Sequence, residues 1–462
     1  MNLLVSSRLK KTDPNIKIPK FSNLLANTLK ISLPAALETF FIGLIGMADT
    51  IMVGRFSDKA LAAVAICQQP VMITLAASVG INAGIIAIVS RRKGENKQQE
   101  ANHTLRQALI IGSIISAIMT VLALLFARPL LVFAGSKDDT IDYALSYFRI
   151  VSLGLFFNYI RLAICSAQRA IGKTSITLVT NVTANLVNIA LNYVLINGHF
   201  GFPRLGVSGA AIATVIGNGV AFIIAWVSIY HRKGFLSVNF KDNWKIDMNA
   251  WRHLFAVANG AFVEQLFMRI GFFMIAKIVN DLGTEQTAIN AIISTIMGIS
   301  FNITDGFAIG ASSLVGRSLG EKDKPKAFAY GRISQICSIA LATVMMTITI
   351  IFRKELANAF TTEKYLVDEA GRLLVYTCVI MLPQSIQWVT TGVLRGAGDT
   401  KYTARSALIS IVFVRPIFSY FFVNILRYGI IGSWASMLID QTLRMTLNNV
   451  RFVNLKWMHI EV

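Results

Sequence analysis

Cysteine, histidine and acidic residues are scarce in this chain of 462 residues, and each scarcity excludes a class of function. The five histidines are dispersed and show no spacing typical of metal ligands, so we expect neither a metal nor another cofactor. The cysteines form no C-x-x-C pair, and we interpret them as small buried side chains rather than as a redox or zinc site. They are Cys67, Cys165, Cys337 and Cys378.

The chain also lacks a nucleotide-binding loop and a recognisable leader. Gly172-Lys173-Thr174 matches the end of a phosphate-binding loop, but Ala167 stands where that loop requires a glycine. The first residues are basic and interrupted by proline, without an apolar segment before a small-residue cleavage site, so we expect no removable signal peptide. Neither an ATP-driven protein nor an enzyme is predicted.

Apolar residues, in contrast, are abundant and occur in long runs. The hydrophobic fraction is 54% and the mean hydropathy is +0.59. Runs of about 20 or more apolar residues, separated by short polar connectors, predict an all-α polytopic membrane protein with twelve transmembrane helices. The expected spans are 29–54, 60–89, 104–127, 141–166, 175–198, 206–230, 249–279, 284–313, 329–352, 368–393, 402–426 and 430–453.

The distribution of charge agrees with this topology. A net charge of +20 would indicate a nucleic-acid partner in a soluble chain. Here the expected spans place the majority of the lysines and arginines on the side of the two termini, in the tail, the connecting loops and the C-terminal end. Positive charge concentrates on the cytoplasmic side of membrane proteins. We therefore predict a multi-pass protein of the cytoplasmic (inner) membrane, with both termini cytoplasmic and no nucleic-acid partner.

The two halves of the chain are copies of one another. Shifting the numbering by 226 aligns them without a gap over a long distance. The shift places Glu38 on Glu264, Gly80 on Gly306, Arg91 on Arg317, Arg169 on Arg395 and Thr174 on Thr400. Six spans per copy predict two parallel six-helix lobes, at 29–230 and 249–462. A cytoplasmic tail at 1–28 and a cytoplasmic linker at 231–248 complete the expected organisation.

The first span carries two carboxylates at a depth where hydrocarbon should surround them. Glu38 and Asp49 are eleven positions apart, which in an α-helix leaves them about 20° apart around the axis and about 16 Å apart along it. An ionisable group at such depth costs about 2.5–3.5 kcal/mol, so we expect both to face the protein interior at two depths. Pro34 and Gly43 favour a bend in this span. These features suggest ion or substrate handling.

The fifth span presents four asparagines on one helical face: Asn181, Asn185, Asn188 and Asn192. Such a stripe forms either hydrogen bonds between helices or the wall of a water-filled cavity, and we favour the cavity because exposed amides are costly in lipid. The face of span 11 that the shift aligns with the stripe consists of Ala407, Ile411, Val414 and Phe418. That face is apolar, so we predict the deeper hydrophilic cavity in the N-terminal lobe.

Several motifs resemble those of the multidrug and toxic compound extrusion (MATE) family, in particular its bacterial NorM/DinF-like members, over nearly the whole chain. The motifs are Asp49-Thr-x-Met-Val-Gly-Arg55, Arg169-Ala-Ile-Gly-Lys-Thr174, Gly206-Val-Ser-Gly-Ala-Ala-Ile-Ala-Thr214, Arg395-Gly-Ala-Gly-Asp-Thr400, and Asp440-Gln-x-x-Arg444 with Lys456-Trp457. The resemblance implies twelve spans in two lobes and cation-driven export of chemically varied, often cationic, compounds.

The resemblance also implies site residues. In the family, a first-span aspartate, here Asp49, and polar residues of span 5, here Asn188, form an ion-binding site; Asn192 replaces an aspartate of some members. In the NorM-like branch a seventh-span glutamate, here Glu264, and a tenth-span aspartate, here replaced by Gln384, bind the cation. The candidates for ion coupling are Glu38, Asp49, Asn188 and Asn192, with Na⁺ considered at Asp49 or Glu264. The candidates for substrate or cation binding are Gln68, Asn181, Asn185, Glu264, Asp305 and Gln384.

Some of the charged residues have a structural alternative. Arg269 follows Glu264 by five residues and could neutralise it, because charges within the membrane usually pair. Asp440 and Arg444 are spaced i, i+4 on span 12 and are expected to pair. Arg415 could hold a carboxylate of the C-terminal lobe, without an indication of which one.

The sequence as a whole predicts a monomeric secondary antiporter that exports organic cations from the cytoplasm in exchange for H⁺ or Na⁺, by rocking of its lobes. One alternative is a flippase or exporter of the same superfamily for lipid-linked oligosaccharides or metabolites, which should have a cationic cavity. Another is a membrane receptor that does not transport, which would not need duplicated acids within the membrane.

Overall fold

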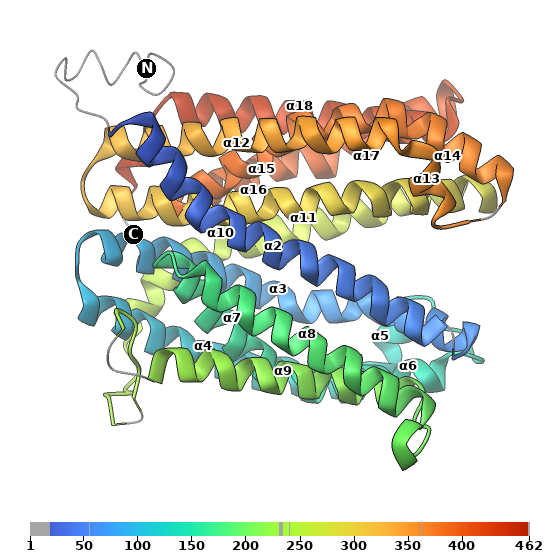
Figure 1. Cartoon of the computed structure of the whole chain (residues 1–462), viewed down its shortest axis with the longest axis horizontal. Coiled ribbons are helices and arrows are strands. Elements are labelled where there is room, and N and C mark those ends of the chain that lie inside the picture. Colours follow the sequence, from blue (N-terminus) through green and yellow to red (C-terminus); the bar gives the residue numbers. More distant parts are fainter. Residues whose placement is uncertain (1–18, 55, 231–233, 240, 362, 461–462) are drawn as a thin grey trace. The chain divides into compact units, whose positions relative to one another are not determined.

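The computed structural model describes residues 19–54, 56–230, 234–239, 241–361 and 363–460 (Figure 1). These residues form helices and turns, with no β-strand among them, as predicted. Most of the expected N-terminal tail, residues 1–18, lies outside the described residues, as do residues 231–233 and 240 of the expected linker. The first helix begins at Phe21, well before the expected start at residue 29.

The long helices follow the expected spans. In the first half they are α2 (Phe21–Gly54), α3 (Asp58–Gly94), α4 (Gln98–Leu125), α6 (Ile141–Leu153) with α7 (Leu155–Ala170), α8 (Thr174–Asn197) and α9 (Val207–Tyr230), with a short α5 (Ala127–Phe133) and the 3₁₀ turn η2 (His199–Gly201). In the second half they are α10 (Met248–Asn280), α11 (Thr284–Gly320), α12 (Lys324–Ile351), α14 (Lys364–Thr377) with η3 (Cys378–Ile380) and α15 (Met381–Gly396), α16 (Thr400–Ala407) with η4 (Leu408–Val414), α17 (Arg415–Tyr420) and η5 (Phe421–Ile425), and α18 (Gly429–Val453). The short elements there are α13 (Arg353–Asn358) and η6 (Lys456–His459).

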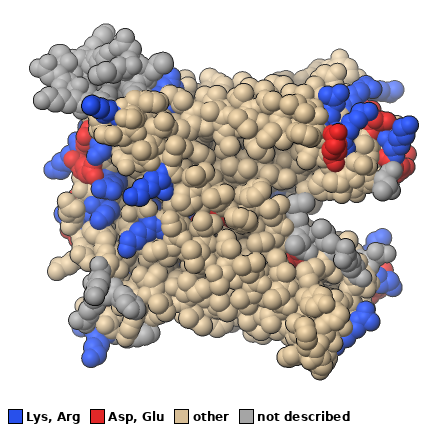
Figure 2. Space-filling model, viewed as in Figure 1, with Lys and Arg blue, Asp and Glu red and all other residues tan. Residues whose placement is uncertain are grey.

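The number of spans agrees with the predicted twelve. Among the described residues, nine helices are long and apolar enough to cross a membrane, and the pair α6–α7, bent by 50°, makes ten. The remaining two positions in the repeat are held by α10 and α18, which have 33 and 25 residues but a more polar composition. On the face visible in Figure 2, charged side chains gather at the helix ends, and the stretches between are nearly free of them. The chain is a multi-pass membrane protein.

The described chain divides into two compact units. We call Leu37–Ala258 the N-terminal lobe, and the described residues up to Ala36 together with those from Asn259 onward the C-terminal lobe. The boundaries lie inside α2 and α10, so the first turns of each of these helices pack with one lobe and the later turns with the other. The lobes therefore contain the functional halves of these two acid-bearing helices: Asp49 and Glu38 in the N-terminal lobe, Glu264 in the C-terminal lobe.

The internal repeat is also a repeat of local backbone structure. The turn after α3 holds Asn96 at φ 57°, and the turn after α11 holds Lys322 at φ 59°. Gly172 and Gly398 likewise have φ 83° and 89°. A positive φ is uncommon for residues other than glycine, so its recurrence at Asn96 and Lys322 reflects a shared turn geometry rather than composition.

Close packing of α15 against α11 builds the core of the C-terminal lobe. A Cβ atom at Gly392 would lie 2.4 Å from the carbonyl oxygen of Ala308, and one at Gly396 would lie 2.3 Å from that of Ser312. Two glycines one turn apart thus let the backbones of the two helices approach, which is the main source of helix association within a membrane. This packing fixes the positions of the polar side chains on α15.

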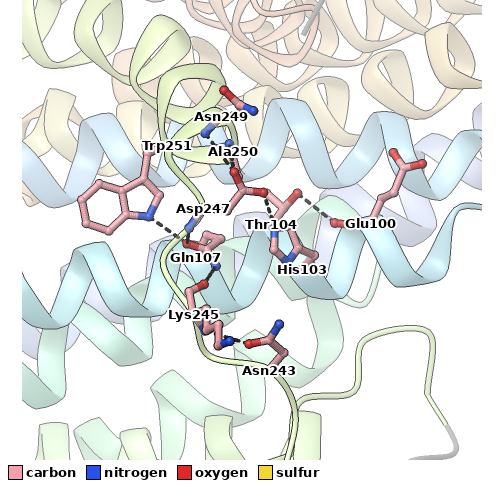
Figure 3. A network of polar contacts seen from close by, with 10 residues as sticks. All are labelled: Glu100, His103, Thr104, Gln107, Asn243, Lys245, Asp247, Asn249, Ala250 and Trp251. Carbon is pink, nitrogen blue, oxygen red and sulfur yellow. Dashed lines mark hydrogen bonds and ion pairs between the residues drawn. The ribbon is translucent and has the colours of Figure 1, made fainter.

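The predicted cytoplasmic linker is docked on α4 of the same lobe (Figure 3). The amide of Gln107, fully buried, donates to the carbonyl of Lys245 at 2.7 Å and accepts from the backbone nitrogen of Asp247 at 3.0 Å and from the indole of Trp251 at 2.9 Å. His103 on α4 pairs with the carboxylate of Asp247 at 3.0 Å. His103 and Gln107 of α4 therefore hold both the linker and the start of α10.

Candidate functional site

Two carboxylates of α2 face α8, at different depths, as predicted from their spacing. Glu38 is fully buried and accepts hydrogen bonds from Arg169, from Asn181 and from the hydroxyl of Thr177, the last at 2.5 Å. Thr177 and Asn181 lie one helical turn apart on α8, and Arg169 ends α7. Glu38 is therefore an ion-paired, hydrogen-bonded carboxylate, separate from Asp49.

Asp49 is surrounded by neutral donors. The amide of Asn192 donates to it at 2.7 Å. With the Asn188 amide turned so that its nitrogen faces Asp49, that nitrogen lies 2.8 and 3.0 Å from the two carboxylate oxygens, and the amide oxygen accepts from the hydroxyl of Thr214 at 3.3 Å. No lysine or arginine of the described chain forms an ion pair with Asp49. Its negative charge is thus solvated by amides and left uncompensated.

A polar cavity of about 130 Å³ opens beside Asp49 in the N-terminal lobe. Residues of α2, α7, α8 and α9 line it: Ile42, Asp49, Arg161, Asn181, Ala184, Asn185, Asn188, Thr214, Gly217 and Asn218. Arg161 is held at one end by Asn181 and by Asn158, the latter at 2.7 Å. The asparagine stripe therefore lines a cavity and also bonds neighbouring helices, so the two interpretations of the stripe both apply. A cavity of this size holds water or a small cation.

In the C-terminal lobe, Glu264 repeats the environment of Glu38. Its carboxylate pairs with Arg395 at 2.9 Å and accepts from the hydroxyl of Thr403 at 2.8 Å. Arg269 is not its partner, so the pairing considered from the sequence is wrong. Each member of this trio lies 226 positions after its counterpart Glu38, Arg169 or Thr177. The internal repeat could have predicted this contact. A Glu, an Arg and a Thr are each repeated at the same shift of 226, which indicates that the three residues contact one another in both halves.

The other predicted residues of the C-terminal lobe lie on α11, α15 and α18. Asp305 accepts from the indole of Trp388 at 2.7 Å, and Gln384 is buried one turn before that indole on α15. Asp440 and Arg444 pair at 3.6 Å, as predicted. Gln68 on α3 is exposed and lies outside the cavity of the N-terminal lobe. The structure thus gathers Asp49, Asn181, Asn185 and Asn188 around one cavity, whereas Glu264 and Asp305 have separate partners.

The prediction that the inner face of span 11 is wholly apolar is wrong. The buried residues there are Ala407, Ile411, Arg415 and Ser419, whereas Val414 is only partly buried and Phe418 is exposed. The cause is the backbone: Leu408–Val414 and Phe421–Ile425 are π-helical, and a π-helix holds more residues per turn than an α-helix. The extra residue rotates the rest of the helix relative to the gapless alignment.

An all-α, multi-pass fold of two repeated lobes, with acids and amides buried between its helices, is the architecture of secondary membrane transporters. Among the described residues, no group of three or more His, Cys, Asp and Glu side chains forms a metal site. The chain belongs to the MatE family: the family model matches residues 34–194 and again residues 261–421, once in each half.

Relatives of known name or structure agree with this family. The chain is 26% identical over 424 residues to the uncharacterized transporter YisQ of Bacillus subtilis, covering 92% of this chain and 93% of that protein. It is 25% identical over 446 residues to a probable multidrug resistance protein NorM of Thermotoga maritima, covering 96% and 95%. A structure described as the outward-facing conformation of a multidrug resistance MATE family transporter matches with a TM-score of 0.87, at 20% identity, over 96% of this chain and 100% of that one.

Proposed function

We propose that this protein is a secondary antiporter of the inner membrane that exports organic, mainly cationic, compounds from the cytoplasm in exchange for H⁺ or Na⁺. The observation that carries the proposal is Asp49, an acid within the membrane that faces a polar cavity and lacks a basic partner among the described residues. The names of the NorM relatives, probable multidrug resistance proteins, support the class of substrate.

Asp49 is suited to bind a coupling cation. An unpaired carboxylate at membrane depth costs about 2.5–3.5 kcal/mol, so a proton or a Na⁺ ion that neutralises it is bound favourably. The carboxylate of Asp49 supplies two oxygen atoms, and the side-chain oxygen of Asn192, whose amide nitrogen donates to Asp49, is buried without a hydrogen-bond donor. Hard cations prefer such oxygen ligands, whereas a proton needs only the carboxylate.

Export follows when the ion and the substrate favour different lobe arrangements, because only a ligand with different affinities for two states shifts their equilibrium. In transporters built from two homologous six-helix lobes, rocking of the lobes supplies two such arrangements. In this scheme Asn181 and Asn185 contribute to the polar wall beside Asp49, and Asp305 and Gln384 contribute to substrate binding in the C-terminal lobe. A role of Glu264 in cation binding stays a prediction, since Arg395 already neutralises it.

The test is transport by the purified protein in liposomes, with pH and Na⁺ gradients imposed separately and ethidium as substrate. Asp49→Asn should abolish gradient-driven transport and leave ethidium binding measurable, because it removes the coupling charge alone. Asn188→Ala should reduce transport less severely, and Asn192→Asp should shift its dependence on pH or Na⁺. Asp139→Asn, in an exposed loop, is the matched control and should transport normally.

Two results would contradict the proposal. Full gradient-driven efflux by a well-folded Asp49→Asn variant would exclude Asp49 as the coupling acid. Transport that needs ATP and ignores both gradients would exclude antiport. A preference for lipid-linked oligosaccharides over ethidium would favour the flippase alternative.

A further inference from the structure

The C-terminal lobe holds a second buried polar cluster, between α17 and α18, that differs in charge from the site around Asp49. Its charged members are Arg415, Asp440 and Arg444, which are 8%, 0% and 3% exposed. Arg444 pairs with Asp440 at 3.6 Å, and Asp440 and Arg444 are the charged groups that act on Arg415. The cluster therefore contains two buried guanidinium groups and one carboxylate.

Asp440 is already well occupied by neutral donors. The hydroxyl of Ser410 donates to its carboxylate and lies 3.1 Å from its backbone carbonyl, and the amide of Gln441 donates at 3.4 Å. One carboxylate thus faces two arginines and two neutral donors. The negative charge available within the cluster does not balance its positive charge.

Several donor atoms of the two arginines have no acceptor. The Nε atom of Arg415 and the Nη1 atom of Arg444 are buried and donate to no acceptor within hydrogen-bond distance among the described residues, and the Nε atom of Arg444 has only the carboxylate of Asp440, at 3.6 Å. The hydroxyl of Ser419, one turn after Arg415, is likewise buried and unpartnered. Buried charged groups in proteins are paired and hydrogen-bonded, so such a set indicates an acceptor that is not part of the chain.

In the internal repeat, this cluster corresponds to the place of the cation site that we propose in the N-terminal lobe. The segment Thr400–Ile425 has 26 residues and its counterpart Thr174–Asn197 has 24, and two π-helical stretches accommodate the two additional residues. When Thr174 is aligned with Thr400 and one residue is inserted in the first π-helical stretch, Arg415 aligns with Asn188. With the same insertion, Ser419 takes the position of Asn192.

The neighbouring helices repeat the correspondence. The last helix of each repeat starts beside a glycine of positive φ, Gly206 at 54° and Gly429 at 56°. Aligning these two glycines places Gln441 on Asn218 and Asp440 on Gly217. Both Asn218 and Gly217 line the cavity beside Asp49. The two lobes thus have polar clusters at equivalent positions of the repeat. The cluster of the N-terminal lobe contains an acid without a basic partner among the described residues, and that of the C-terminal lobe contains two arginines and one acid.

We propose that Arg415 and Arg444 form a binding site for a small monovalent anion in the C-terminal lobe, with Ser419 as an additional donor. Two guanidinium groups bind a carboxylate or a halide through charge-assisted hydrogen bonds. The ring of Phe272 stacks on the Arg415 guanidinium, with 5.5 Å between the ring centroid and the guanidinium carbon, and helps to hold that side chain. The anion is either free chloride or the carboxylate of an organic solute, and the site is independent of the proposed antiport.

Anion binding is measured on the purified full-length protein, without transport, by equilibrium dialysis with radioactive chloride and with labelled benzoate. Wild-type protein should bind about one chloride or one benzoate per chain, as one uncompensated charge requires. Displacement of chloride by benzoate but not by benzamide identifies a carboxylate site, and failure of benzoate to displace chloride identifies a halide site.

Variants distinguish this site from surface binding. Arg415→Gln should weaken binding at least about tenfold, since a hydrogen bond to a charged group contributes more than that factor. Arg415→Lys should retain part of the affinity for the anion. Asp440→Asn should strengthen binding, because it removes the competing carboxylate, and this gain cannot result from misfolding. Arg269→Gln, a half-buried arginine of α10 outside the cluster, is the control and should bind like wild type.

The proposal is overturned if folded wild-type protein shows no saturable binding of either anion. It is also overturned if Arg415→Gln and Asp440→Asn, folded by size-exclusion chromatography, bind as the wild type does.

Discussion

At the scale of single residues, the buried acids of this protein separate into two kinds. Glu38 and Glu264 are each held by an arginine and a threonine, whereas Asp49 is held by neutral amides. The first kind has its charge compensated and stabilises the lobe. The second kind has no basic partner among the described residues, and this is why we propose it as the coupling acid. Burial separates them as well, because Glu38 and Glu264 are buried and Asp49 is partly exposed.

The ion pairs predict a stability effect. Glu264→Gln leaves the Arg395 guanidinium without its carboxylate, and breaking a buried pair in this way costs about 3–5 kcal/mol. We expect Glu264→Gln and Arg395→Gln each to lower the unfolding temperature strongly, and the pair Glu264→Leu with Arg395→Met to recover part of the loss. Thermal unfolding in detergent measures the effect, and a double-mutant cycle separates it from the individual substitutions.

A different result would assign Glu264 another role. If Glu264→Gln unfolds like the wild type but loses affinity for cationic substrates and keeps affinity for neutral ones, Glu264 belongs to the substrate site. Glu38→Gln is the matched comparison in the other lobe, since it breaks the equivalent pair.

At the scale of elements, the linker and α4 form one structural unit. Gln107 satisfies three backbone and side-chain groups of the linker and of α10, so it is the central contact of this docking (Figure 3). The hydrogen bond from His103 lowers the pKa of Asp247, which also accepts from the backbone nitrogens of Ala250 and Asn249. A carboxyl group whose pKa is lower in the folded than in the unfolded protein stabilises the fold at pH values above its unfolded pKa. This stabilisation is lost as the pH falls through its folded pKa. The linker contact therefore holds at neutral pH.

Removing the central amide should release the linker. Gln107→Leu leaves the three partners unsatisfied, at about 1–3 kcal/mol each, and so raises the population in which the linker is detached. Limited trypsin digestion should then cleave after the exposed Lys245 at least several-fold faster than in the wild type. Gln98→Leu, which removes an exposed contact to Gly234 at 3.1 Å, should cleave at the wild-type rate. Equal rates for Gln107→Leu and wild type would show that the linker is held by other contacts.

At the scale of the whole molecule, duplication produced two lobes with one scaffold and two chemistries. The Glu–Arg–Thr trio and the turn geometry persist in both, whereas the polar sites differ: amides around an acid in one, two arginines around an acid in the other. Conserved contacts lie where a change would destabilise the lobe. The divergent ones lie around the cavity of the N-terminal lobe and at its counterpart in the repeat.

The proposed orientation of the molecule is testable as a whole. Both termini should be cytoplasmic, because positive charge concentrates on that side. A fluorescent protein fused to the C-terminus should fluoresce in a bacterial host, and alkaline phosphatase fused there should be inactive. An active phosphatase would place the C-terminus on the opposite side and reverse the direction of the proposed export.

The sequence by itself determined the membrane class, the helical spans and the duplication, and it singled out Asp49 and three of the asparagines that line the cavity of the N-terminal lobe, because runs of apolar residues, a constant shift of 226 and the spacing of acids and amides are properties of the linear chain. The helix period placed Glu38, Asp49 and the asparagines on facing sides, and the contacts followed.

The partner of each charge was decided only by the tertiary structure. Arg169 lies 131 positions after Glu38, and the pair depends on how α7 and α8 pack against α2, which no local pattern encodes. Sequence proximity favoured Arg269 for Glu264, although the fold supplies Arg395. The inserted residue in a π-helical stretch was equally invisible, because it shows only in the backbone. It places Arg415 in the interior, at a position where a gapless alignment expects an apolar side chain.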